Sequence, residues 1–306
     1  MLTNATVLCT RKRLIGAVRV KDLHGTTSFV DYRDGFLRWF DSYGTETDRR
    51  PLHLPGPARV LAADTAGSVA LSTSDGLFIS TRAGLLRTGL HADAAAFLGD
   101  AVVVSASRED SHIVALIDPT TGAIAARRLI HVHDAAGVFV PHPTDALVFL
   151  ELGRGQDGGT LHCVKGNDAA TFEVTALPVA EDEVIADVHP RGDQLLVVNS
   201  QGRSSPRVLA WPGLRERGRF DVESIELALG LADIGCWVDE DHIALYATED
   251  SLILTDQSLE RPRRVDLPIS FGDTADIEGL LKLTDREVDI EVWTPEARST
   301  VTVRFA

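Results

Sequence analysis

The stretch Gly99-Asp100-Ala101-Val102-Val103-Val104-Ser105 places an acidic turn directly before a short run of apolar and small residues. A valine-rich run that follows a Gly-Asp turn is typical of a β-strand. The acidic turn returns, again followed by apolar residues, at Asp145, Asp193, Asp241 and Asp285. Successive aspartates are separated by 45, 48, 48 and 44 residues. The sequence therefore contains an internal repeat.

A second acidic position precedes each of these turns by 7 to 11 residues and opens another short apolar run. These positions are Asp93, Asp134, Asp182, Asp233 and Asp276. The interval fits one strand, and a repeat of about 45 residues has room for about four strands. A twisted four-stranded sheet cannot bury both faces alone, whereas such sheets can do so by stacking around an axis. The pattern predicts an all-β chain folded as a β-propeller.

We expect seven four-stranded antiparallel blades in a single domain that spans residues 1–306. The expected blades lie near residues 14–56, 57–92, 93–133, 134–181, 182–232, 233–275 and 276–306. The last of these shows only three strands, and residues 3–9 supply the fourth. The N-terminal and C-terminal strands would then close the propeller in one shared blade. Six blades remain an alternative if residues 1–56 are read differently.

Composition and charge narrow the range of partners. The chain has 45 acidic and 30 basic residues and a formal net charge of −15. Nucleic-acid binding needs clustered basic residues. The strongest basic run here is only Arg11-Lys12-Arg13, so we expect the chain not to bind nucleic acid.

We expect no membrane contact, because no apolar run reaches the roughly 20 residues of a membrane-spanning helix. We also expect no signal peptide. Three widely spaced cysteines without a C-x-x-C pair favour a reducing, cytoplasmic location.

Several turn phrases carry a resemblance to a known superfamily. They are Leu116-Ile117-Asp118-Pro119-Thr120-Thr121-Gly122, Pro141-His142-Pro143-Thr144-Asp145 and Val188-His189-Pro190-Arg191-Gly192-Asp193. On these phrases the chain resembles the WD40/YVTN-like β-propeller superfamily over essentially its whole length. The resemblance rests on turn chemistry. It departs from strict WD40 repeats, because the Trp-Asp and Gly-His dipeptides are absent.

In propellers of this kind, the loops that open the innermost strands rim the mouth of the central channel. By register, the equivalent positions here are Arg13, Arg59, Asp93, Asp134, Glu183, Asp233 and Asp276. Converging carboxylates repel one another unless a cation, an arginine or water offsets the charge. One hypothesis is therefore a site for a divalent cation such as Ca²⁺, or for a cationic group, with Arg13 and Arg59 favouring an anion on one side. The alternative is that each acid hydrogen-bonds the backbone of its own loop.

Two functions remain open. The first is a non-catalytic scaffold that presents a propeller face to a protein partner, because the sequence has no contiguous catalytic motif. The second is an enzyme of lyase, hydrolase or cyclase type, or a binding protein for a small ligand or metal, with its site at the channel mouth. The acid–base groups of an enzyme would be His133, Asp134, Asp93 and Asp233. Its ligand-binding residues would be Arg13, Arg59, Glu183 and Asp276.

Two basic segments, Leu214–Arg219 and Arg261–Arg264, are expected near the outer strands of adjacent blades. They would either dock an acidic partner or protect exposed strand edges from pairing with other chains.

Overall fold

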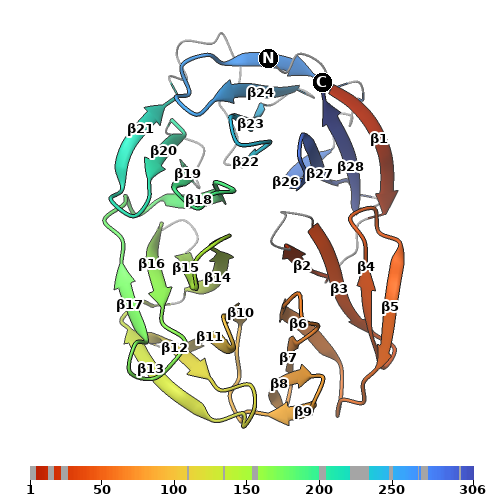
Figure 1. Cartoon of the computed structure of the whole chain (residues 1–306), viewed down its shortest axis with the longest axis vertical. Coiled ribbons are helices and arrows are strands. Elements are labelled where there is room, and N and C mark those ends of the chain that lie inside the picture. Colours follow the sequence, from red (N-terminus) through yellow and green to blue (C-terminus); the bar gives the residue numbers. More distant parts are fainter. Residues whose placement is uncertain are drawn as a thin grey trace. The chain divides into compact units, whose positions relative to one another are not determined.

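The computed structural model describes residues 5–12, 17–21, 27–108, 110–133, 135–153, 158–199, 205–220, 234–247, 251–267, 269, 275–295 and 298–306. The regular elements formed by these residues are the strands β1 to β28 (Figure 1). None of the described residues forms a helix that could cross a membrane. By their contacts the residues divide into two compact units, which are residues 16–181 and residues 1–15 with 182–306.

The unit of residues 16–181 holds four antiparallel sheets of four consecutive strands. The first two sheets are β2 (Val18–Lys21), β3 (Thr27–Arg33), β4 (Phe36–Phe40) and β5 (Glu46–Pro51), then β6 (Ala58–Ala63), β7 (Val69–Thr73), β8 (Gly76–Thr81) and β9 (Gly84–Arg87). The next two are β10 (Ala94–Leu98), β11 (Ala101–Arg108), β12 (Ser111–Ile117) and β13 (Ile124–Ile130), then β14 (Ala136–Pro141), β15 (Leu147–Gly153), β16 (Gly159–Lys165) and β17 (Glu173–Ala176). Their first strands β2, β6, β10 and β14 contact one another in that order.

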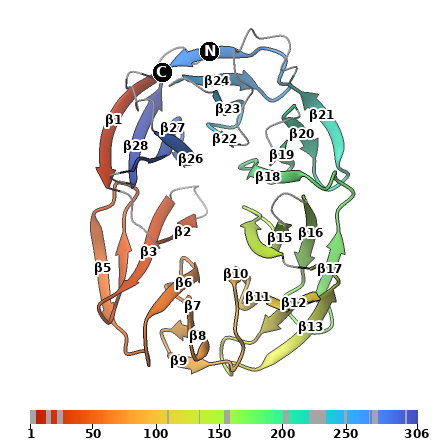
Figure 2. The same cartoon turned by 180° about the vertical axis from the view of Figure 1, so that it is seen from behind.

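The other unit holds three sheets. They are β18 (Glu183–Val188), β19 (Gln194–Asn199), β20 (Arg207–Ala210) and β21 (Arg215–Arg219), then β22 (Gly235–Trp237), β23 (His242–Ala247), β24 (Ser251–Asp256) and β25 (Arg263–Asp266), and finally β26 (Asp276–Thr284), β27 (Glu287–Trp293) and β28 (Arg298–Phe305) with β1 (Ala5–Lys12). Strand β1 pairs antiparallel with β28, from Ala5 opposite Phe305 to Lys12 opposite Ser299 (Figure 2).

Seven four-stranded antiparallel blades make the fold a β-propeller, as the repeat predicts, and the six-bladed alternative is wrong. The N-terminal strand completes the last sheet, which confirms its predicted place. The proposed extent of a single domain, residues 1–306, stays a prediction.

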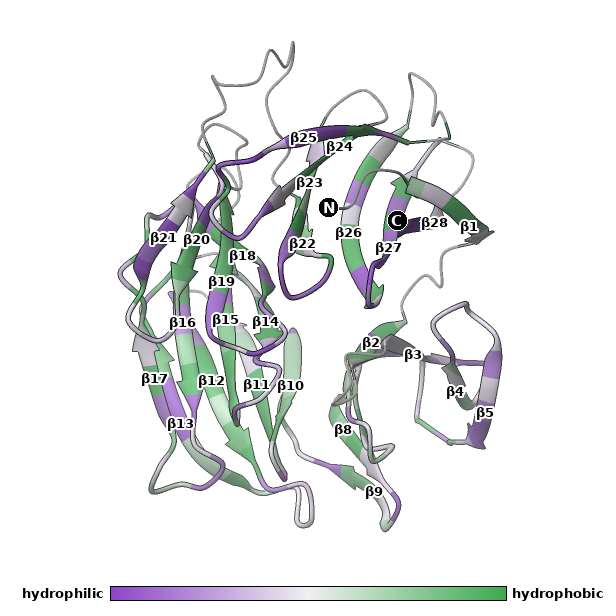
Figure 3. Cartoon of the chain, turned by 45° about the horizontal axis from the view of Figure 1, so that its top comes forward, coloured by the Kyte–Doolittle hydropathy of each residue, from purple (hydrophilic) through white to green (hydrophobic). Residues whose placement is uncertain are grey.

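The burial of each strand follows its position in the sheet. Second and third strands such as β19 and β24 are almost wholly buried. Fourth strands such as β5 and β21 are largely exposed and polar (Figure 3). The apolar clusters lie between consecutive sheets of one unit, for example between the β10–β13 and β14–β17 sheets. This placement explains why runs of branched apolar residues alternate with short polar strands in the sequence.

Candidate functional site

Four aspartates occupy the same place in four sheets, at the turn between the third and fourth strands. Each carboxylate accepts hydrogen bonds from backbone N–H groups of its own turn. In one example, Oδ1 of Asp168 accepts from Ala170 and Thr171 at 2.8 and 2.9 Å. The backbone and side-chain hydrogen bonds of Thr171 lower the pKa of Asp168. The four residues are Asp41, Asp118, Asp168 and Asp256. These acids stabilise turns, which is a role typical of aspartate in hairpins.

Of the predicted channel-mouth residues, Arg59 and Asp93 are brought together. The guanidinium Nη2 of Arg59, on β6, donates to the backbone carbonyl of Asp93 at 2.7 Å and so joins two neighbouring sheets. The Asp93 carboxylate accepts the backbone N–H of Ser107 at 2.6 Å. Both side chains lie on exposed residues. The Asp93 carboxylate thus bonds the backbone of strand β11 in its own sheet, not the backbone of its own loop.

His133 has a carboxylate neighbour that the sequence analysis did not name. Its Nδ1 lies 3.2 Å from Oδ1 of Asp110, with the two side chains 73% and 85% exposed. Asp110 lies in the turn between β11 and β12. Because it is 23 residues from His133 in the sequence, no local pattern predicts the contact. An ion pair between such exposed groups contributes little free energy.

In the other unit, Glu183 is held by Arg207. The Arg207 guanidinium donates to both carboxylate oxygens of Glu183, and its Nη1 lies 3.2 Å from Oε2 of Glu216. The Glu183 side chain is only 8% exposed. This network joins β18, β20 and β21 of one sheet.

The remaining predicted residues are not placed by the structure. Arg13, Asp134 and Asp233 lie outside the described residues, and Asp276 is described only as the first residue of β26. Among the side chains that the structure does describe, no group of three or more His, Cys, Asp or Glu residues is arranged to hold a metal ion. The Ca²⁺ hypothesis, whose ligands are mostly outside that set, stays a prediction.

A substitution separates the two interpretations of Asp93. If the carboxylate only accepts the Ser107 N–H, Asp93→Asn keeps an acceptor oxygen, and we expect the free energy of unfolding to change by less than about 1 kcal/mol. If Asp93 is a cation ligand, the same change should remove Ca²⁺ binding. Chemical denaturation and calorimetric titration of chelator-treated protein measure the two effects, and loss of a wild-type Ca²⁺ signal would contradict the backbone-bonding role.

A buried polar cluster, missed by the sequence analysis, lies between the β10–β13 and β14–β17 sheets. Ser105 on β11 forms a very short hydrogen bond with Nε2 of His112 on β12. Gly137 on β14 packs over this pair so closely that a Cβ atom there would clash with the Ser105 hydroxyl. Among the described residues, Nδ1 of His112, Nδ1 of His162 and the Thr160 hydroxyl are buried without a hydrogen-bond partner.

Both histidines of this cluster are held in the neutral form. Burial lowers the pKa of His112 below its ordinary value of 6.5, and the nearby Asp93 carboxylate only partly opposes this. Burial also lowers the pKa of His162, and repulsion from His112 adds to the effect. The available sequence signal was a serine or histidine beside the buried apolar residues of the strands β11, β12 and β16.

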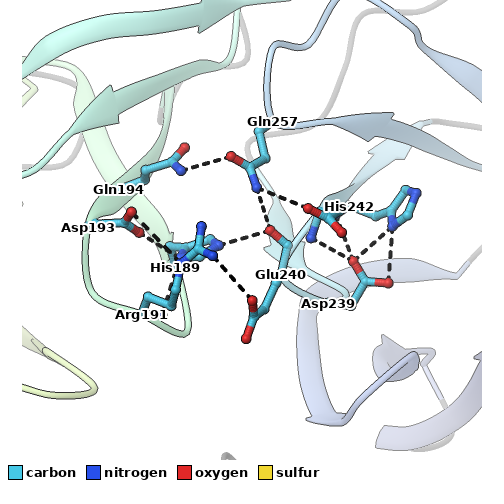
Figure 4. Close-up of polar contacts among 9 residues, drawn as sticks. His189, Arg191, Asp193, Gln194, Asp239, Glu240, His242 and Gln257 are labelled. Carbon is cyan, nitrogen blue, oxygen red and sulfur yellow. Dashed lines mark hydrogen bonds and ion pairs between the residues drawn. The ribbon is translucent and has the colours of Figure 1, made fainter.

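A second polar network joins the β18–β21 sheet to the β22–β25 sheet (Figure 4). Nε2 of His189 hydrogen-bonds the backbone carbonyl of Glu240 at 3.0 Å, and its Nδ1 accepts the Arg191 backbone N–H at 3.2 Å and lies 2.8 Å from Oδ1 of Asp193. Gln257 donates to the same carbonyl at 2.6 Å and accepts from Gln194 at 2.9 Å. His189, Asp193 and Glu240 come from turns that contain the repeated aspartates, whereas Gln257 lies in the turn between β24 and β25.

The third sheet of this unit is joined to the same network. The Asp239 carboxylate accepts from Nδ1 of His242 at 2.8 Å, and Nε of Arg286 lies 3.7 Å from its other oxygen. Beneath these turns, the fully buried Trp237 meets the His189 ring edge to face, with centroids 4.5 Å apart. Its backbone N–H donates to Asp187 of the preceding sheet at 3.0 Å. Polar groups therefore bind three consecutive sheets together.

Comparisons with known proteins show the fold alone. No protein-family model matches the chain, and no curated protein matches it in sequence. One similar solved structure is the Dos1 propeller, which is 11% identical with a TM-score of 0.56. The match covers 91% of this chain and 75% of that chain. Since 794 solved chains match this one in structure, likeness of fold cannot single out one function.

Proposed function

We propose that the chain is a non-catalytic, cytoplasmic interaction scaffold of the WD40/YVTN-like type that presents a propeller face to a protein partner. The observation that carries this proposal is that charged and polar side chains join consecutive sheets, as Figure 4 shows for His189, Glu240 and Gln257. Blades held in this way form a rigid surface, and a rigid surface loses little conformational entropy when a partner binds.

Further polar contacts between sheets support the same role in the other unit. Arg50 on β5 donates to the Gly67 carbonyl and to the Ser80 hydroxyl of the next sheet, at 3.3 and 3.1 Å. Arg128 on β13 donates to the Phe172 carbonyl of the following sheet at 2.6 Å.

The geometry gives less support to the enzyme alternative. General acid–base catalysis benefits from a positioned group in a site from which water is excluded. His133 instead lies beside Asp110 with both side chains mostly exposed. Its proposed partners Asp134 and Asp233 lie outside the described residues, so the enzyme hypothesis stays a prediction.

The cysteines are consistent with the proposed cytoplasmic location. Among the described residues no two cysteines form a disulfide, and Cys163 and Cys236 are buried. Burial raises the pKa of the Cys163 thiol to about 11, so this cysteine is an apolar packing residue with little thiolate character.

The scaffold proposal predicts that a specific protein partner can be captured and then reconstituted. The immobilised full chain should retain a protein from native lysate of its source organism, and the purified partner should rebind with a saturable Kd. The control is an unrelated propeller immobilised at the same density. Failure to retain any protein above that control would contradict the proposal, and so would substrate turnover that His133→Ala abolishes.

A further inference from the structure

Two basic outer strands, β21 and β25, belong to neighbouring sheets in the unit of residues 182–306. Gly218 on β21 packs directly against the backbone carbonyl of Ser258, in the turn that leads to β25. A Cβ atom at position 218 would clash with that carbonyl, so glycine permits the close approach. The two strands and the turn before β25 therefore form one surface. We call it the arginine surface, and its basic residues are Arg215, Arg217, Arg219, Arg261, Arg263 and Arg264.

Four of these arginines have no ion-pair partner in the part of the chain that the structure describes. Arg219 is bound to Glu216 at 2.7 Å, and Arg264 to Asp266 at 2.9 Å. The other four are exposed and take part in no such contact: Arg215, Arg217, Arg261 and Arg263. Unpaired guanidinium groups gathered at one place are ready to bind a ligand that carries carboxylates.

The charge of this surface is opposite to that of the chain. The segments 215–219 and 260–266 carry six arginines and three acids, a net charge of +3, whereas the whole chain carries −15. An acidic ligand is attracted to the surface and repelled by the remaining protein, which restricts both its position and its length. A long polyanion such as duplex DNA would extend beyond the arginines onto an acidic body.

The strand edges indicate how such a ligand binds. Arg217 is an extra residue in β21, because Glu216 lies opposite Leu209 and Gly218 lies opposite Val208. Such a bulge, together with charged side chains, opposes the addition of another strand. A ligand can still bind here by forming ion pairs with the arginine side chains. Since a strand of five residues spans about 17 Å, the surface fits about five residues of extended chain.

We propose that the arginine surface docks a short acidic segment of the protein partner through carboxylate–guanidinium pairs. This inference rests on the proposed scaffold function and names the chemistry of the partner.

The test uses the full chain and a fluorescein-labelled peptide of about ten residues in which glutamate and serine alternate. We expect saturable binding by fluorescence anisotropy, which weakens as NaCl rises from about 50 to about 300 mM because salt screens the ion pairs. The double variant Arg217→Glu/Arg263→Glu should bind at least about tenfold more weakly. The matched control is Arg82→Glu/Arg127→Glu, which changes the net charge equally at exposed arginines of the other unit.

Three outcomes would overturn the inference. They are equal weakening by the control, no peptide binding by the wild type, and tighter binding of a duplex DNA of about 20 base pairs than of the peptide. Thermal unfolding shows whether the variants keep their fold. If the double variant does not fold, peptide binding is measured with Arg217→Glu and Arg263→Glu separately. If a captured partner binds wild type and Arg217→Glu/Arg263→Glu equally, this inference fails while the scaffold function stands.

Discussion

Replacement of Trp237 with alanine is expected to lower the free energy of unfolding by about 3–5 kcal/mol. Trp237 is fully buried between the β18–β21 and β22–β25 sheets, where it packs in one apolar cluster with Ile243 and Leu245. Alanine would leave a cavity and would remove the edge-to-face contact with the His189 ring. Urea denaturation followed by far-ultraviolet circular dichroism measures the loss.

The matched control is Trp237→Phe. Phenylalanine keeps an aromatic ring beside His189 and removes the indole N–H, which is buried without an acceptor among the described residues. We expect the free energy of unfolding of this variant to fall by less than about 2 kcal/mol. Most of the apolar packing is kept, and the buried N–H without an acceptor is removed. A loss below about 1 kcal/mol for Trp237→Ala would show that this interface does not hold the two sheets together. If Trp237→Ala does not fold, the free energies of unfolding of Trp237→Phe and His189→Gln still show how much each side chain of this contact contributes to stability.

Acidification is expected to destabilise the unit of residues 16–181 through His112 and His162. Both residues are buried and neutral in the folded chain, with pKa values lowered from 6.5 mainly by burial. In the unfolded chain they titrate near 6.5, so below that pH the unfolded state binds more protons and the free energy of unfolding falls. Above about pH 7 both states are neutral, and the pair contributes no pH dependence.

The measurement compares the free energy of unfolding at about pH 7.5 and about pH 5.5 for the wild type and for His162→Leu. Leucine suits the position, because His162 lies on the same face of β16 as the buried Val164. It removes one titrating group and the repulsion felt by His112, so the decrease at low pH should be smaller than in the wild type. The control is His53→Gln at an exposed position. An unchanged decrease in His162→Leu, or an equal change in His53→Gln, would contradict the assignment.

Part of the candidate site could be predicted from the sequence. The repeat placed Arg59 and Asp93 at equivalent positions of consecutive sheets, and the structure joins them through the Asp93 carbonyl. The contact of His133 with Asp110, and of Glu183 with Arg207, could not be predicted in this way. A repeat indicates which residues are equivalent. It does not tell which side chains from non-adjacent strands and turns of a sheet meet.

The sequence by itself determined the all-β class and favoured seven blades over six, with the N-terminal segment as the fourth strand of the last sheet. These features depend on local patterns of apolar runs and turn residues, which recur with the repeat and are insensitive to distant contacts. Only the tertiary structure decided the buried cluster of Ser105, His112 and His162, and the network of His189, Glu240 and Gln257. Their members lie up to 68 residues apart, as His189 and Gln257 show, and they meet because packed sheets bring specific faces and turns together.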